Sequence, residues 1–97
     1  MIELAVADIG GTHARFAMAR IDGDDIWLGE PLTLRTGDYS GIAEAWAQFI
    51  KKAGFAPRMA AIAAAGPLRG GAIKLTNATW TIDVEKLRAL GLEQVTL

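Results

Sequence analysis

Two apolar runs separated by a pair of glycines constrain the fold of this chain more than any other feature. Residues 2–7 and 14–21 are largely apolar, and Gly10 and Gly11 lie in the short segment between them. Apolar runs of this length predict β-strands, and a Gly-Gly pair favours a tight turn. We therefore expect two antiparallel strands joined by a turn. Both alternating residue sets of the first run are largely apolar despite Glu3, so we expect that strand to be covered on both faces.

The chemical groups around this turn suit the phosphate tail of a nucleotide. Glycine lacks a Cβ and can adopt positive φ, so a ligand can approach the amides of Gly10 and Gly11 closely, and a row of amides binds anions. Asp8 supplies the carboxylate oxygens that Mg²⁺ prefers. Thr12 adds a hydroxyl and Arg15 a planar fork of donors. The pattern predicts a site for a metal–nucleotide triphosphate, and a plain hairpin is the alternative.

Two better-known phosphate loops fit this segment less well. The chain contains neither Gly-x-x-x-x-Gly-Lys-Ser/Thr nor a Gly-x-Gly-x-x-Gly that opens a helix. The residues after Thr12 favour a strand, whereas both of those loops lead into a helix.

The middle of the chain predicts a hairpin, a third strand and a helix. Asp22-Gly23-Asp24 favours a hairpin turn, and residues 26–35 predict a strand that is irregular or at a sheet edge because it contains Pro31. A helix is expected over residues 41–53, with Asp38 or Ser40 as its cap and Gly54 at its end. Its apolar face recurs at helical spacing and is expected in the core: Ile42, Trp46, Phe49 and Ile50.

The last third predicts short strands and one more helix. Residues 59–65 form an alanine-rich strand that ends at Gly66-Pro67, and residues 72–76 form another. Between them, Arg69-Gly70-Gly71 is interpreted as a plain hairpin because no acid or hydroxyl accompanies it. Asp83 is expected to cap a helix over residues 84–90, and residues 95–97 begin a strand.

Length and composition exclude several classes of protein. A chain of 97 residues makes one small domain, and its net charge of -1 gives no reason to expect a nucleic-acid or membrane-surface partner. The absence of Cys excludes disulfides and thiolate metal sites and agrees with a cytoplasmic location. No apolar run is long enough to span a membrane, and no signal peptide is apparent.

Three segments together resemble the bacterial glucokinase family, whose members are sugar kinases with the actin and hexokinase ATPase fold. Ala7 to Ala17 resembles the family's first phosphate loop, Ala63 to Pro67 is a second match, and Leu75 to Trp80 resembles its Thr-Asn-x-x-Trp. The three matches have the family's order and similar spacing, and they cover almost the whole chain. His13 departs from the Asn that is usual in the family, although both side chains can donate a hydrogen bond.

The resemblance implies a fold and an activity. The fold is an α/β actin-like ATPase (ribonuclease H-like) domain, a mixed sheet that starts with three antiparallel strands followed by a helix. Residues 1–97 are expected to be the N-terminal domain of a kinase that uses ATP and Mg²⁺ to convert glucose to glucose 6-phosphate in glycolysis. Asp8 is the expected metal ligand, and the expected nucleotide contacts are Ala7, Asp8, Ile9, Gly10, Gly11, Thr12 and Arg15.

The resemblance also implies sugar contacts near Pro67, Asn77 and Trp80. Asn77 would bond a sugar hydroxyl and Trp80 would offer a flat apolar wall, the alternative being a turn with a buried Trp. In the family the catalytic base belongs to an Asn-Asp pair that would follow Leu97, so no catalytic residue is expected within this chain. We expect the fragment to be inactive alone and to self-associate through its unsheltered last strand.

Three other functions stay open on the sequence. A kinase for another hexose would share these motifs, because sugar choice resides mostly beyond Leu97 in the family. A non-catalytic actin-like module could keep the phosphate loop without the chemistry. A small binding or structural domain would use the first turn as a plain hairpin.

Overall fold

The computed structural model describes residues 1–76 and 78–97. Asn77, one of the predicted sugar contacts, lies outside the described residues. A main sheet has the order β3-β2-β1-β5-β9, with β4 also paired to β2, and a small sheet has the order β6-β7-β8. The strands are β1 (Ile2–Ile9), β2 (His13–Asp22), β3 (Asp25–Leu28), β4 (Leu32–Arg35), β5 (Met59–Ala64), β6 (Leu68–Arg69), β7 (Ala72–Lys74), β8 (Thr81–Asp83) and β9 (Gln94–Thr96). The helices are the 3₁₀ turn η1 (Thr36–Asp38), α1 (Ile42–Ala53) and α2 (Val84–Ala89).

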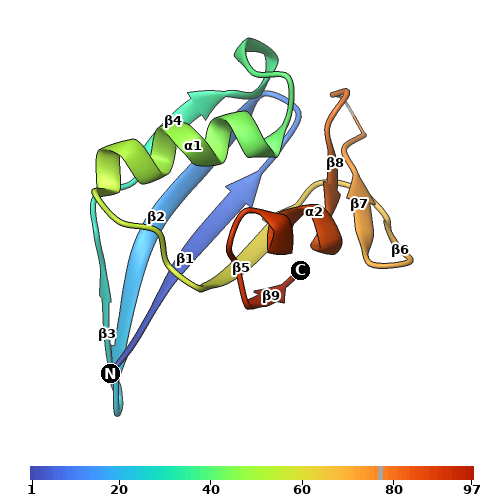
Figure 1. Cartoon of the computed structure of the whole chain (residues 1–97). Helices are drawn as coiled ribbons and strands as arrows, with labels where there is room; N and C mark the ends of the chain where they lie inside the picture. Colours follow the sequence, from blue (N-terminus) through green and yellow to red (C-terminus); the bar gives the residue numbers. More distant parts are fainter. Residues whose placement is uncertain (77) are drawn as a thin grey trace.

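The main sheet opens with antiparallel strands and continues with parallel ones, as predicted. β2 is antiparallel to β1, β3 and β4, whereas β5 is parallel to both β1 and β9. The expected third strand is divided into β3 and β4, which pair with opposite ends of β2 (Figure 1). The interruption contains Pro31, which has no N–H for the ladder, and Gly29, whose N–H donates to the Met18 carbonyl at 2.8 Å.

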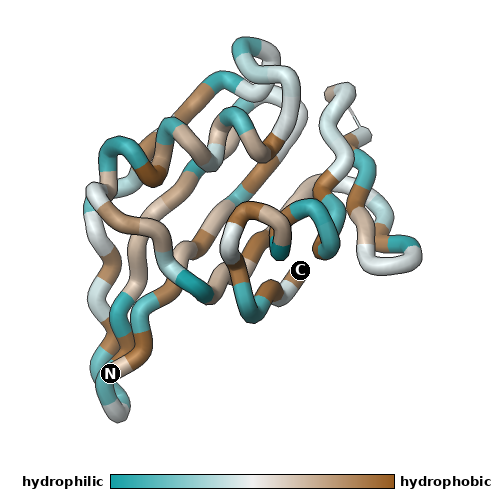
Figure 2. The backbone as a smooth tube through the Cα atoms, in the orientation of Figure 1, coloured by the Kyte–Doolittle hydropathy of each residue, from teal (hydrophilic) through white to brown (hydrophobic). Residues whose placement is uncertain are grey.

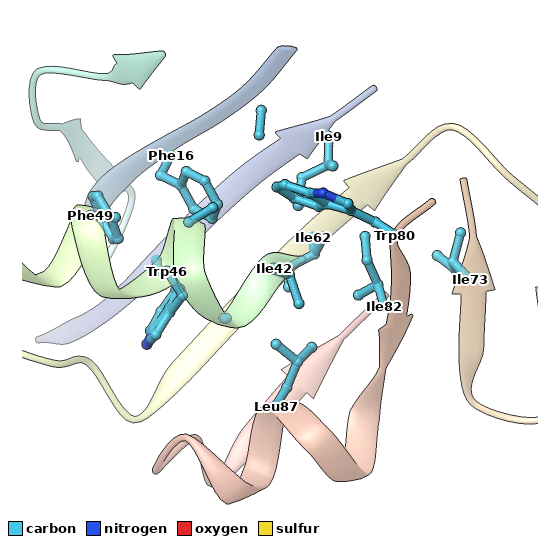
Figure 3. Close-up of a cluster of buried hydrophobic side chains, with 14 of the residues drawn as sticks. Ile9, Phe16, Ile42, Trp46, Phe49, Ile62, Ile73, Trp80, Ile82 and Leu87 are labelled. Atoms are coloured by element: carbon cyan, nitrogen blue, oxygen red, sulfur yellow. The ribbon is translucent and has the colours of Figure 1, made fainter. Parts of the chain in front are cut away.

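Helix α1 packs on the sheet through the aromatic face that its sequence predicts. Phe16 of β2 stacks on Phe49 with ring centroids 5.4 Å apart and meets Trp46 edge-on at 6.3 Å. Such pairs add about 1 kcal/mol each to the burial of apolar area. Figure 3 shows these side chains between the helix and the sheet. Gly54 ends α1 as predicted, with φ 86°.

The predicted cap of α1 was wrong. The residue at the cap position is Gly41, and no side chain caps the helix. Ser40 lies one residue earlier, and its hydroxyl instead donates to Glu44 Oε2 at 2.7 Å. The cap of α2 is confirmed, because the Asp83 carboxylate accepts the N–H of Glu85 at 2.8 Å.

The prediction that β1 is covered on both faces is also wrong for the described residues. Ala5 and Ile9 are buried on the face that α1 covers, whereas Leu4 and Val6, on the opposite face, stay partly exposed. Figure 1 shows both helices on the same side of the main sheet. Figure 2 shows that the strands are largely hydrophobic and that the turn joining β2 to β3 is hydrophilic. One-sided burial therefore determines which β1 residues are accessible.

The small sheet extends the core beyond β5. Gly70 and Gly71 have φ of 58° and 77°, as a two-residue turn between β6 and β7 requires. This confirms the plain hairpin predicted for that Gly-Gly pair. Gly66 lies against β7 so closely that a Cβ there would be 2.1 Å from the Lys74 carbonyl oxygen. Glycine at position 66 thus permits β5 to continue directly into the second sheet.

Candidate functional site

The structure brings the first two family motifs to one edge of the main sheet. β1 and β5 are parallel, and Ile9 pairs in register with Ala64, so both strands end at the same edge. The Ala65 N–H donates to the Ile9 carbonyl at 3.0 Å. The glycine turn after β1 and the Gly66-Pro67 segment after β5 therefore leave the sheet side by side. This edge is where open α/β sheets bind ligands, beyond the carboxyl ends of parallel strands.

The third motif is bonded to the second. The Thr76 N–H donates to the Ala65 carbonyl at 3.1 Å, and the Leu75 N–H donates to the Trp80 carbonyl at 3.1 Å. A continuous series of backbone hydrogen bonds thus connects the segments after β1, β5 and β7. The three motifs, which are separate in the sequence, are therefore close together in the fold.

The glycine turn presents fewer free amides than predicted. The Gly10 N–H donates to the His13 carbonyl at 2.8 Å, so it is not available to an anion. In the described part of the chain, no acceptor contacts the N–H groups of Gly11 and Thr12. Positive φ is not the reason for the glycines here, because neither Gly10 nor Gly11 is among the glycines with positive φ. The available anion donors are therefore the amides of Gly11 and Thr12.

Asp8 and Arg15 lie on one face of the sheet beside the turn. They are directly opposite each other on β1 and β2, and both are exposed. Residues opposite each other in an antiparallel pair project to the same face. Together with the turn they line a hollow of about 280 Å³, whose other lining residues are Gly10, Gly11, Thr12 and His13. A carboxylate, a guanidinium and free amides thus converge on one open hollow.

The residues present fit Mg²⁺ that is bound together with a phosphate tail. Among residues 1–76 and 78–97, no group of three His, Cys, Asp or Glu residues forms a protein cage for a metal. Mg²⁺ usually keeps several waters and is held by one or two carboxylates plus substrate phosphates. The exposed carboxylate of Asp8 at the rim of the hollow meets that requirement.

Two of the predicted nucleotide contacts belong to the core instead. The Ile9 side chain is fully buried at 0% exposure, and Ala7 packs against the core cluster. Both residues alternate with Asp8 along β1, so their side chains project to the face that α1 covers. Ile9 contributes to the site through its carbonyl, which holds Ala65.

Thr36 is a residue of this site that the sequence did not indicate. It is the buried polar residue of the described chain, with 1% exposure. Its hydroxyl donates to the Gly10 carbonyl at 2.7 Å, and its N–H donates to the Thr12 carbonyl at 2.9 Å. The contact spans 26 positions of sequence and follows from the pairing of β4 with β2. No local pattern could have revealed it.

The two described sugar contacts, Pro67 and Trp80, differ in exposure. Pro67 is exposed beyond the end of β5. Trp80 is 1% exposed, and its indole N–H donates to the Tyr39 carbonyl at 3.0 Å. Figure 3 shows its ring among the buried side chains. The expectation of a flat wall open to a sugar does not agree with this burial, and the alternative of a turn with a buried Trp is the arrangement observed.

Comparison with known proteins identifies the family. The family model described as glucokinase matches residues 5–97. The chain belongs to the glucokinase family. It is 45% identical over 83 residues to a glucokinase of Zymomonas mobilis, covering 84% of this chain and 26% of that protein. It is also 45% identical over 97 residues to a glucokinase of Sinorhizobium medicae, covering 95% of this chain and 27% of that protein.

A solved glucokinase shares the fold. The crystal structure of glucokinase from an Antarctic psychrotroph superposes with a TM-score of 0.88 at 29% identity, covering 99% of this chain and 31% of that one. This likeness agrees with the predicted actin-like ATPase domain. This glucokinase-family chain spans between a quarter and a third of the length of the proteins it matches. No helix of the described residues is both long enough and apolar enough to cross a bilayer.

Proposed function

We propose that this chain is the N-terminal phosphate-loop domain of a cytoplasmic, ATP-dependent glucokinase that converts glucose to glucose 6-phosphate. The observation that supports this most strongly is that three family motifs lie at one sheet edge. They lie beside a hollow lined by the Asp8 carboxylate, the free amides of Gly11 and Thr12 and the Arg15 guanidinium. Phosphoryl transfer requires little covalent chemistry from the protein, and it depends on positioning and charge stabilisation. The groups at this edge suit those two tasks.

Each group at the hollow has a role in the proposal. Asp8 would hold Mg²⁺, which when bound neutralises charge on the phosphate oxygens. The free amides of Gly11 and Thr12 donate to the β- and γ-phosphates of ATP, and the Thr12 hydroxyl adds a further donor. Arg15, exposed on the same face as Asp8, supplies positive charge to the same group.

The sugar is proposed to lie on the Gly66-Pro67 side of the same edge. Pro67 is exposed there, and Asn77 is proposed to bond a sugar hydroxyl. Trp80 contributes by anchoring the segment that carries Asn77, because its indole is bonded to Tyr39. β9 is parallel to β5, so in a parent of the relatives' length the residues after it would emerge at this same edge. The catalytic base is proposed to come from there, and the 97-residue chain alone is then inactive.

Isothermal titration of Mg²⁺–ATP into the full-length parent tests the nucleotide site. Asp8→Asn should weaken binding by at least roughly 10- to 100-fold, the loss that is typical when even a residue supporting a metal ligand is removed. Asp22→Asn, in the exposed end of β2 far from the hollow, is the matched control and should bind like the wild type. Equal binding by Asp8→Asn and the wild type would remove the metal role, and no binding by the wild type would leave a non-nucleotide domain.

A panel of hexoses tests the substrate. The full-length parent should phosphorylate glucose with the highest kcat/KM, measured by coupled release of ADP. A preference for another hexose would assign a different sugar kinase, and ATP binding without turnover on any sugar would favour a non-catalytic module.

The isolated 97-residue chain is proposed to self-associate through β9. This strand lies at the edge of the main sheet and is paired on one side by β5. Unpaired strand edges recruit further strands. Light scattering at rising concentration should show an increasing mass, and a constant monomer mass would contradict the proposal.

A further inference from the structure

We infer that Thr36 is a positioning residue for nucleotide binding, because it fixes the direction of the Gly11 amide. The inference rests on the proposed nucleotide site. Thr36 is not itself placed to touch the ligand, since its side chain is 1% exposed and is occupied by the Gly10 carbonyl at 2.7 Å. It acts through the turn between β1 and β2.

The geometry of the peptide bond makes this coupling direct. A trans peptide unit is planar, and its C=O and the following N–H point in opposite directions. The Gly10 carbonyl and the Gly11 N–H belong to one such unit. Because the Thr36 hydroxyl holds the Gly10 carbonyl inward, the Gly11 N–H is directed outward, away from Thr36.

A second bond from the same residue holds the other end of the turn. The Thr36 N–H donates to the Thr12 carbonyl at 2.9 Å, which fixes the Thr12–His13 peptide unit. The Gly10 N–H is meanwhile held by the His13 carbonyl at 2.8 Å. The turn is thus restrained from inside at both ends, and the amides of Gly11 and Thr12 are left for a ligand.

Thr36 is itself rigidly placed. It follows β4 directly, one position beyond Arg35, which pairs with His13. Its carbonyl accepts the N–H of Tyr39 at 3.3 Å, and the Tyr39 carbonyl accepts the indole of buried Trp80. These hydrogen bonds therefore connect the turn, through Thr36 and Tyr39, to the buried Trp80 of the hydrophobic core. Glycine has no side chain to restrain its own backbone, so an external restraint of this kind matters most at a Gly-Gly turn.

The test is steady-state kinetics on the full-length parent. Thr36→Val keeps the shape of the side chain and removes the hydroxyl, so the Gly10–Gly11 peptide unit loses its restraint. We expect KM for ATP to rise roughly tenfold, as is typical for the loss of a residue that orients a ligating group, with KM for glucose unchanged. Thr36→Ser, which keeps the hydroxyl, should stay within about twofold of the wild type. Thr81→Val, at an exposed position of β8, is the matched control.

The outcomes separate this inference from the proposed function. Wild-type KM for ATP in Thr36→Val, or an equal rise of both KM values, would overturn the positioning role while the nucleotide site stands. No binding of Mg²⁺–ATP by the wild type would overturn the proposed function itself. If Thr36→Val does not fold, Thr36→Ala takes its place: a tenfold rise in KM for ATP alone supports the role, and a wild-type KM for ATP contradicts it because the hydroxyl has been removed.

Discussion

The chain contains two Gly-Gly turns, and the structure uses them in different ways. In the turn at Gly70 and Gly71, both residues have positive φ, and a Cβ at either position would meet no atom within 4 Å. In the turn at Gly10 and Gly11, neither residue is among those with positive φ, and both line a hollow beside an exposed carboxylate. The same dipeptide thus serves backbone conformation in one place and, in the proposed function, access for a ligand in the other.

The surroundings of each turn explain this difference. The second turn is exposed and reverses the chain between two short strands, and its Gly71 carbonyl accepts the N–H of Val84 at 3.1 Å. The first turn has its carbonyls at Gly10 and Thr12 held by Thr36, which leaves amides on the opposite side. Both turns thus have a carbonyl held by another element. They differ in that the first turn lines a hollow with the exposed carboxylate of Asp8, as the proposed phosphate site requires.

The largest effect on stability is expected at Gly66, which lies in neither Gly-Gly turn and is required by close packing. At Gly66 a Cβ would lie 2.1 Å from the Lys74 carbonyl oxygen, and backbone cannot move aside cheaply. Gly66→Ala should lower the free energy of unfolding by about 3 kcal/mol, measured by urea denaturation. Gly37→Ala is the control, because a Cβ there meets nothing within 4 Å and its φ is not positive. Equal stability of the two variants would show that β5 and β7 do not pack this closely.

The charged residues beside the two turns give the next contrast. Arg15 lines the hollow at the first turn, and Arg69 precedes the second; both are exposed. Arg15→Gln should raise KM for ATP in the full-length parent roughly tenfold, by removing a charge-assisted contact to phosphate. Arg69→Gln should leave KM unchanged. The effect of Arg15→Gln should diminish at high salt, since the contact is solvent-exposed. An equal change in KM for ATP in the two variants would contradict the proposed difference between the turns.

The smallest effect is expected from the second turn. Gly71→Ala forces a side chain into a backbone with φ 77° and should cost about 1 kcal/mol of stability without changing KM for ATP. Gly71→Asn should cost less, because Asn tolerates the left-handed region better. Thermal unfolding and steady-state kinetics measure both quantities. A change in KM for ATP would show that this turn also contacts the nucleotide.

Local patterns predicted most of the fold correctly. Alternation and turn residues located the strands, and the spacing of Ile42, Trp46 and Phe49 identified the buried face of α1. The α1 cap was misplaced locally, at Ser40 or Asp38 instead of Gly41, and the other error arose where a contact from distant sequence decided the outcome. An irregular or edge strand was predicted from Pro31, although its division into β3 and β4 was not, and the one-sided burial of β1 was missed because it depends on where α1 packs.

The candidate site was also predicted in part. The types of Asp8, Thr12 and Arg15 indicated the chemistry, and the structure places these residues around one hollow. The two bonds from Thr36 were not foreseeable from local sequence, the burial of Trp80 was foreseen only as the alternative to a sugar wall, and the bonded amide of Gly10 was not predicted. The Thr36 bonds and the Trp80 bond to Tyr39 join segments far apart in the sequence, whereas the Gly10 amide is bonded within the turn, to His13 three residues on.

Backbone amide NMR of the ¹⁵N-labelled full-length parent tests the central claim most directly. On addition of Mg²⁺–ATP, we predict large shifts for the amide resonances of Gly11 and Thr12, whose N–H groups are free, and small ones for Gly70 and Gly71. The four residues are compared in one sample, so a change in overall fold cannot imitate the result. Unchanged Gly11 and Thr12 resonances at saturating Mg²⁺–ATP would contradict the assignment of the first turn as the phosphate site.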